Sequence, residues 1–276
     1  MSKLTPEDVV LRYSKRGMNI LKKYLRDGYC RTAAEKLLHA ERGTVLLTTG
    51  FYVAGYAETD GPLGTVAVAE ALNHLGFHSV VVTDKYCKGF FELKQLDVEY
   101  VDIAADEQIY EDILDKYNPV YMISIERCGE NAEHEYANMR GVSITSETAA
   151  IDHLFELAPE KHIPTIGVGD GGNEIGMGNV KDIISEKLEL NPCVVPVDDL
   201  IIATTSNWGA YALTAWLQKL SGEEVLFTYE EAEPYLAATL EIGSVDGVLK
   251  EKKMGVDGFD MTVEKEILDS LAEAIA

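Results

Sequence analysis

Hydrophobic residues recur at two different spacings along the chain, and the spacing changes near residue 44. The first forty residues carry apolar positions that broadly fit one helical stripe, namely Val9, Val10, Tyr13, Met18, Leu21 and Leu25. The helix-start signal Thr5-Pro6-Glu7-Asp8 precedes this stripe. From Thr44 onward, short β-rich runs alternate with segments of helix length. We therefore predict one or two leading helices over about 1–42, followed by a core in which strands and helices alternate.

The β-rich runs predict six strands, near 44–49, 79–83, 98–102, 119–125, 163–168 and 200–204. Helical spacing marks the segments 64–75, 148–157 and 208–220 between them. Since parallel neighbours need crossover connections, this order predicts an α/β fold with a mostly parallel sheet flanked by helices, a Rossmann-like three-layer architecture. We expect a C-terminal appendage at about 221–276, ending in a helix at 262–275. Without an internal repeat or a linker-like tract, we predict a single domain over 1–276.

Composition narrows the classes of partner. The 276 residues are 46% hydrophobic and carry a formal charge of -23, from 47 acidic and 24 basic residues. Such a charge repels phosphate backbones and anionic lipid surfaces, so we expect neither a nucleic acid nor a membrane as a partner. No apolar run reaches the length of a bilayer span, and the N-terminus lacks a secretory pattern, which predicts a cytoplasmic protein. The four cysteines form no Cys-x-x-Cys pair and are expected to be ordinary thiols.

Two polar segments follow predicted strands in the first half of the chain. The carboxyl ends of parallel strands are where ligands collect in such sheets. Glu58 and Asp60, after strand 44–49, are suited to an amine or a cation, and the helix start at 64–66 offers free N–H groups to a carboxylate or phosphate. Glu126 and Arg127 end strand 119–125, where Arg127 either forks onto a substrate carboxylate or forms a structural ion pair.

Two further segments follow the last two strands. The run from Gly167 to Asn179 contains six glycines, which we attribute to close approach of the backbone to a ligand. In that run, Asp170, Asn173 and Glu174 are suited to holding a divalent cation or orienting an amine. Ser206 and Asn207, after strand 200–204, either cap the next helix or bind the ligand. The glycine-rich run matches neither a dinucleotide fingerprint nor a P-loop, so NAD and P-loop ATP hydrolysis are disfavoured.

Five segments together resemble the D-glutamate cyclase C-terminal domain family. They are Glu58-Thr59-Asp60-Gly61-Pro62, Ser124-Ile125-Glu126-Arg127, Asn138-Met139-Arg140-Gly141, Gly169-Asp170-Gly171-Gly172-Asn173-Glu174-Ile175-Gly176-Met177-Gly178 and Ser206-Asn207-Trp208-Gly209. The resemblance spans about 44–259, and the combination is more specific than any one segment. It implies a hydro-lyase that closes D-glutamate to 5-oxo-D-proline with loss of water. Larger relatives join this domain to a hydro-lyase-like domain, so a separate hydro-lyase-like protein or a second copy of this chain is a candidate partner.

The resemblance turns the strand-end residues into candidates with roles. The catalytic candidates are Asp170, Glu174 and Glu126. The substrate-binding candidates are Glu58, Asp60, Gly61, Gly64, Thr65, Arg127, Asn138, Gly171, Gly172, Asn173, Ser206 and Asn207. No cofactor is implied firmly, but Asp60, Glu126 and Asp170 are candidate ligands for Mg²⁺.

Two other functions remain open on sequence alone. The same loops would also serve an amino-acid or nucleotide sensor that binds without turnover. Gly169-Asp170-Gly171-Gly172-Asn173-Glu174 additionally resembles the last magnesium-binding motif of haloacid-dehalogenase-type phosphatases, with Asp84 as the best strand-end aspartate. Asp84 lacks the second aspartate two residues later that this chemistry needs, which disfavours the phosphatase.

Overall fold

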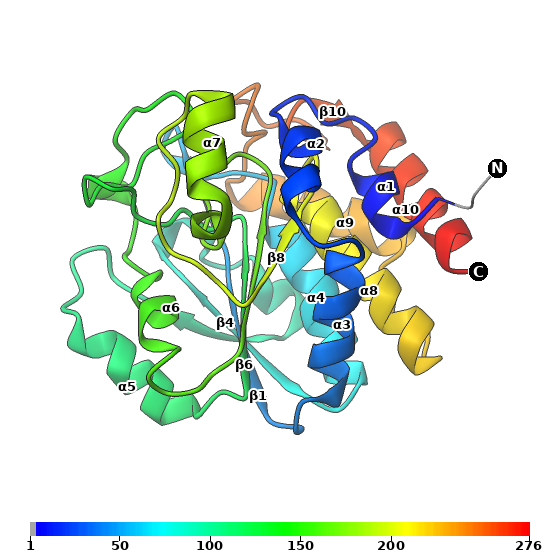
Figure 1. Ribbon diagram of the computed structural model, residues 1–276, viewed down its shortest axis with the longest axis horizontal. Coiled ribbons are helices and arrows are strands. Elements are labelled where there is room, and N and C mark those ends of the chain that lie inside the picture. The colour runs from blue at the N-terminus through cyan, green and yellow to red at the C-terminus, as the bar shows by residue number, and fades with distance from the viewer. Residues whose placement is uncertain (1–3) are drawn as a thin grey trace.

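A six-stranded parallel sheet forms the centre of the molecule in the computed structural model, which describes residues 4–276 (Figure 1). Its strands, in chain order, are β1 (Thr44–Thr48), β4 (His78–Thr83), β5 (Asp97–Tyr100), β6 (Tyr121–Ile125), β7 (Thr165–Gly169) and β8 (Asp199–Ile202). Across the sheet they lie in the order β5-β4-β1-β6-β7-β8. This is the 3-2-1-4-5-6 order of Rossmann folds, whose ligand crevice lies where the order reverses, here between β1 and β6. The predicted fold class is therefore confirmed.

Burial on both faces explains why the central strands could be found from sequence. In β1, the side chains of Val45, Leu46 and Leu47 are all fully buried. Leu46 pairs with Val80 of β4 on one side and Met122 of β6 on the other. Parallel strands covered by helices on both faces appear in the sequence as continuous apolar runs, and all six predicted strands lie within two residues of the observed ones.

Helices cover both faces of this sheet. The α-helices are α1 (Pro6–Val10), α2 (Met18–Leu21), α3 (Tyr29–His39), α4 (Pro62–His74), α5 (Gln108–Tyr117), α6 (His153–Leu157), α7 (Lys181–Leu188), α8 (Ser206–Ser221), α9 (Tyr229–Ile242) and α10 (Met261–Ile275). Helices α3, α4 and α8 lie together on one face, and α5, α6 and α7 lie on the other (Figure 1). Short 3₁₀ turns connect several elements, at η1 (Lys22–Tyr24), η2 (Lys85–Cys87), η3 (Phe91–Lys94), η4 (Thr145–Glu147) and η5 (Met177–Val180).

Two small hairpins and the chain ends complete the fold. The hairpins pair β2 (Tyr52–Val53) with β3 (Tyr56–Ala57) and β9 (Gly255–Val256) with β10 (Phe259–Asp260). Helix α10 packs beside α1 and α8, where Glu264 accepts hydrogen bonds from Trp208 Nε1 at 2.6 Å and from the Tyr211 hydroxyl at 2.8 Å. The C-terminal segment is thus pinned to the helical layer of the sheet.

Three predicted elements differ from the structure. The leading segment holds three α-helices rather than one or two, because Gly17 and Gly28 take positive φ values of 85° and 68° and divide the run. The helix predicted at 148–157 is shorter in the structure, where the α-helical part is α6, His153–Leu157. The appendage contains α9, which sequence analysis missed although Thr228 and Glu231 form a capping box at its start.

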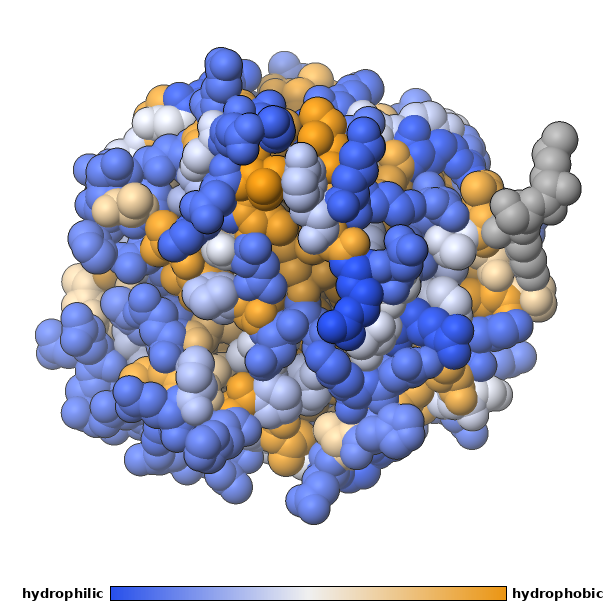
Figure 2. Space-filling model, viewed as in Figure 1, coloured by the Kyte–Doolittle hydropathy of each residue, from blue (hydrophilic) through white to orange (hydrophobic). Residues whose placement is uncertain are grey.

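Hydrophilic residues cover most of the face shown in Figure 2, with apolar side chains visible between them. The four cysteines are buried free thiols, as expected. Within residues 4–276, no helix is long and apolar enough to cross a membrane.

Candidate active site

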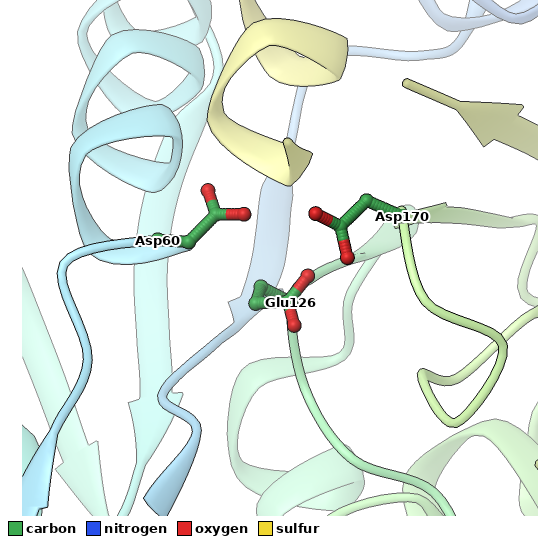
Figure 3. Close-up of side chains that lie close together, drawn as sticks. All are labelled: Asp60, Glu126 and Asp170. Atoms are coloured by element: carbon green, nitrogen blue, oxygen red, sulfur yellow. The ribbon is translucent and has the colours of Figure 1, made fainter. Parts of the chain in front are cut away.

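Three buried carboxylates meet where the strand order reverses. Asp60 lies in the loop between β3 and α4, Glu126 directly follows β6, and Asp170 directly follows β7. One oxygen of each lies within 4.8 Å of the others, and the three side chains point toward one another (Figure 3). Glu126 and Asp170 also line a cavity of about 270 Å³. This volume is close to the lower end of ordinary ligand pockets, about 300 Å³, and suits a small metabolite.

The N-terminus of α8 holds Asp60 in place. Asp60 Oδ2 accepts a hydrogen bond from the Ser206 backbone N–H at 2.8 Å, and Asp60 Oδ1 accepts one from the Asn207 N–H at 2.7 Å. The first N–H groups of a helix have no partner within the helix, and they favour a negative charge. Ser206 is therefore part of the site through its backbone as well as its hydroxyl.

Backbone geometry turns Glu126 into the cluster. Glu126 has a φ of 51°, in the left-handed region that few residues other than glycine adopt. The turn leaves Glu126 Oε2 at 2.5 Å from the Ser206 hydroxyl, which donates to it. Gly61 makes room for this turn, because a Cβ on Gly61 would lie 2.9 Å from that of Glu126. A strained backbone at a strand end is a feature that accompanies functional sites.

Sequence analysis missed the cation of the site, Arg16, and a further acid, Asp257. Arg16 Nη1 donates to both oxygens of Asp170, at 2.8 and 2.7 Å, and Arg16 Nη2 lies 2.6 Å from Asp257 Oδ2. Arg16 belongs to the segment between α1 and α2, and Asp257 to the turn of the β9–β10 hairpin. Neither follows a strand of the central sheet, so neither could be found by the argument that identified the other acids.

A fourth acid of the predicted set lies beside this cluster. Glu58 lines the same cavity and is 6% exposed, and its carboxylate has no hydrogen-bond donor within residues 4–276. The cavity wall also includes Asp257 and Arg16, while Arg140 and Lys250 contribute exposed basic side chains. The site therefore has a floor of carboxylates and basic groups farther out.

Burial and mutual repulsion make these acids hold protons. Burial, with repulsion from Asp257, raises the pKa of Asp60 to about 8. Burial also raises the pKa of Glu58, of Glu126 and of Asp170 well above the usual carboxyl range, and neighbouring carboxylates add to each shift. The Arg16 guanidinium opposes the shift at Asp170. The carboxyls of the cluster therefore bind protons more tightly than isolated carboxyls do, and Arg16 favours the ionised form at Asp170.

Arg127 does not face the cavity, which corrects its assignment to substrate binding. Its fully buried guanidinium donates to Asp84 Oδ2 at 2.6 Å and to the carbonyl oxygens of Gly50 and Ala149 at 2.8 and 2.6 Å. The structural ion pair, which the sequence had left open, is the observed one. Since Asp84 is engaged in this pair, it is also not placed as the nucleophile that a phosphatase would need.

The start of α4 is likewise not free for a ligand. Asn207 Oδ1 accepts hydrogen bonds from the N–H groups of Gly61 and Gly64 at 2.9 and 2.7 Å, and Asn207 Nδ2 donates to the Thr59 carbonyl. Thr65 donates its hydroxyl to the carbonyl of Gly61 and is fully buried. Gly64, Thr65 and the Asn207 side chain therefore build the fold around Asp60 instead of contacting a substrate.

Glu174 shapes the glycine-rich loop, because both of its carboxylate oxygens accept hydrogen bonds from the loop backbone. Its oxygens accept hydrogen bonds from the N–H groups of Gly171 and Gly172, both at 2.7 Å, and of Asp170 at 3.3 Å. Close packing within the protein accounts for several of these glycines, and their approach to a ligand stays a prediction. A Cβ on Gly171 would lie 2.8 Å from Glu174 Oε1, for example.

The remaining candidates lie around the cavity mouth. Asn138 and Asn173 line the cavity. Asn138 Oδ1 caps a turn by accepting from the N–H groups of Arg140 and Val142, and Asn173 Nδ2 donates to the Ala137 carbonyl at 2.8 Å. Gly171 and Gly172 line a neighbouring cavity of about 340 Å³.

Comparison with known proteins identifies the family. The model of the family described as "D-glutamate cyclase-like, C-terminal" matches residues 7–272. The chain belongs to this family. Over 212 residues it is 34% identical to the human protein named "D-glutamate cyclase, mitochondrial". The match covers 67% of this chain and 34% of that relative, so the chain spans about a third of the relative's length.

Solved structures match this D-glutamate cyclase-like chain distantly. A UDP-glucose 4-epimerase from Brucella ovis in complex with NAD aligns with a TM-score of 0.33 and 16% identity, over 54% of this chain and 49% of that one. The aldohexose dehydrogenase of Thermoplasma acidophilum aligns with a TM-score of 0.30 and 12% identity, over 85% and 88%. At these scores neither structure bears on ligand or chemistry.

Proposed function

We propose that the cavity above Asp60, Glu126 and Asp170 closes D-glutamate to 5-oxo-D-proline with loss of water. The observation that carries this proposal is the buried carboxylate cluster at the strand-order reversal, in a chain of the D-glutamate cyclase-like family. In the reaction the α-amine attacks the side-chain carboxyl carbon, a C–N bond forms, and the C–O bond to the departing oxygen breaks. The ammonium nitrogen must lose two protons, one before the attack and one after the C–N bond has formed, and the departing oxygen must gain two protons to leave as water.

A group of neighbouring carboxyls with raised pKa values suits both proton transfers. An ionised carboxylate can accept the proton of the substrate ammonium, and a neighbouring carboxyl that holds its proton near pH 7 can donate it to the departing oxygen. Glu126 and Asp170 line the cavity, which makes them the best-placed acid and base. Asp60 acts next to them as a proton-holding group fixed by the start of α8.

A divalent cation fits the same three carboxylates. Their oxygens are close enough to ligate one ion, and hard oxygen ligands suit Mg²⁺. Such an ion would polarise the substrate carboxyl group and stabilise the oxyanion that forms during attack. Because Arg16 binds both oxygens of Asp170, a cation at this position would compete with the guanidinium for that carboxylate.

A product assay tests the proposal. The purified chain is incubated with D- or L-glutamate, with and without Mg²⁺, and 5-oxoproline is separated by chiral chromatography. We expect 5-oxo-D-proline from the wild type and at least a hundredfold less from Glu126→Gln, since losing a positioned acid or base costs about 10²–10⁴ in rate. Asp115→Asn is the matched control, because Asp115 is an exposed acid outside the cavity.

The assay also separates the cyclase from a sensor. Binding of D-glutamate without product, under all metal conditions, would overturn the cyclase and favour binding without turnover. Equal product from the wild type and Glu126→Gln would place the chemistry elsewhere in the molecule.

A further inference from the structure

Arg16 is a half-buried cation shared between two acids of the cavity. Its side chain is 25% exposed, whereas those of Asp170 and Asp257 are 0% and 3% exposed. Nη1 binds both oxygens of Asp170, and Nη2 contacts Asp257. The guanidinium also lines the cavity, so a ligand entering the cavity meets the Arg16–Asp170 ion pair directly.

Any ligand that opens this ion pair must replace both of its charges. A buried ion pair that loses one partner leaves an uncompensated charge, which is far more costly than exchanging the whole pair. An α-amino acid carries an ammonium and a carboxylate on one carbon and can take the place of both partners. Glu58 provides a second, independent sign of a cationic ligand group, because its buried carboxylate lines the cavity and has no hydrogen-bond donor within residues 4–276.

We propose that Arg16 is the residue that recognises the α-carboxylate of the substrate, and that the α-ammonium takes the place of Arg16 beside Asp170, within reach of Glu58. This inference rests on the proposed function, since it assigns recognition of an amino acid at the same site. Arg16 stays anchored through Nη2 to Asp257 while Nη1 turns from Asp170 to the ligand. Its planar fork matches a carboxylate, which a lysine ammonium would not do equally well.

Product release follows from the same exchange. Ring closure converts the charged ammonium into a neutral amide nitrogen, so 5-oxoproline retains a carboxylate but has no cation for Asp170. The product therefore cannot replace the ion pair, and the Arg16–Asp170 pair re-forms as it leaves. We expect 5-oxo-D-proline to bind at least tenfold more weakly than an unreactive α-amino acid of similar size.

Two unreactive probes isolate the recognition step. D-norvaline keeps the α-ammonium and α-carboxylate but has no side-chain carboxyl group to cyclise, and glutarate has two carboxylates but no ammonium. Isothermal titration calorimetry on the whole chain gives their Kd values for the wild type, Arg16→Met, Arg16→Lys and Arg12→Met. Arg12 is the matched control, because it lies on the same segment but pairs with Glu266, and it does not line the cavity.

For the wild type and Arg12→Met, we expect D-norvaline to bind at least tenfold more tightly than glutarate. Arg16→Met should weaken D-norvaline by roughly tenfold to a hundredfold, the usual worth of a charged hydrogen-bonded contact. Arg16→Lys preserves the charge, and so the fold, but should still weaken binding several-fold. If circular dichroism shows that Arg16→Met is unfolded, the D-norvaline Kd of Arg16→Lys tests the role of Arg16.

Two results would overturn the inference: glutarate binding the wild type as tightly as D-norvaline, or an unchanged D-norvaline Kd in Arg16→Lys. Failure of the proposed function would give a different pair of results. D-norvaline binding would still depend on Arg16, but the wild type would form no 5-oxoproline from D-glutamate.

Discussion

Replacing Asp60 by asparagine should flatten the dependence of folding stability on pH. The pKa of Asp60 is raised from 3.8 to about 8, so the folded state holds a proton that the unfolded chain has released. The stability from this proton is fully present below pH 3.8 and is lost as pH rises through about 8. One bound proton changes the free energy of unfolding by at most about 1.4 kcal/mol per pH unit.

The magnitude follows from proton occupancy. Nearly every folded molecule holds the proton at pH 6, and about half do so at pH 8. Integrating over this window gives a loss of about 2 kcal/mol for the wild type. Neighbouring acids share the proton, so the free energy of unfolding of Asp60→Asn should still fall from pH 6 to pH 8, but by clearly less than that of the wild type. The variant should also be less stable at both pH values, by about 1–3 kcal/mol, because the amide group cannot accept hydrogen bonds from the N–H groups of both Ser206 and Asn207.

Urea unfolding at pH 6 and pH 8, followed by tryptophan fluorescence, measures these free energies. Asp115→Asn should keep the wild-type difference between the two pH values, because Asp115 is an exposed acid paired with Lys161. The same pH difference in Asp60→Asn as in the wild type would rule out proton binding by Asp60 as its cause. A gain in wild-type stability from pH 6 to pH 8 would rule it out as well.

Three other substitutions test the structural roles assigned around the site. Arg127→Met leaves Asp84 buried and unpaired, so it should lower the free energy of unfolding by about 3–5 kcal/mol in urea titrations. Unchanged stability together with weakened D-glutamate binding would instead indicate that Arg127 binds the substrate. Asn207→Ala removes the acceptor for two N–H groups at the start of α4 and should lower the melting temperature, while an unchanged value would contradict this capping role. Glu174→Gln weakens three hydrogen bonds within the glycine-rich loop and should speed amide hydrogen exchange at 170–172, and unaltered protection there would show that the loop holds its shape without the carboxylate.

One physical reason explains why the strands and several acids of the site could be predicted from the sequence. Strands buried on both faces need apolar runs, and the carboxyl ends of parallel strands meet at one edge of the sheet. Polar residues directly after such runs must therefore lie near one another. Glu126 and Asp170 directly follow β6 and β7 and could be located in this way, whereas Asp60 lies beyond the β2–β3 hairpin that follows β1.

The same argument could not decide which way a side chain points. Glu126 and Arg127 are neighbours in sequence, yet Glu126 enters the cluster while Arg127 turns into the fold to pair with Asp84. The left-handed backbone at Glu126 sends the two side chains in different directions. The residue types around Glu126 do not indicate that conformation. Arg16 could not be predicted from the sequence for a different reason: it lies 154 residues from Asp170 and does not follow a strand. Such contacts depend on how α1, α2 and the β9–β10 hairpin pack, which periodicity does not encode.

In the proposed reaction, the carboxylate cluster joins the amine of D-glutamate to its own side-chain carboxyl group. The most direct measurement follows D-[5-¹³C]glutamate by ¹³C NMR with the wild type, Glu126→Gln and Asp115→Asn. We expect the labelled carboxylate resonance to be replaced by that of a lactam carbonyl with the wild type and Asp115→Asn, and at least a hundredfold more slowly with Glu126→Gln. A label that stays a carboxylate with the wild type, with and without Mg²⁺, or that converts equally fast with Glu126→Gln, would rule out this reaction at the cluster.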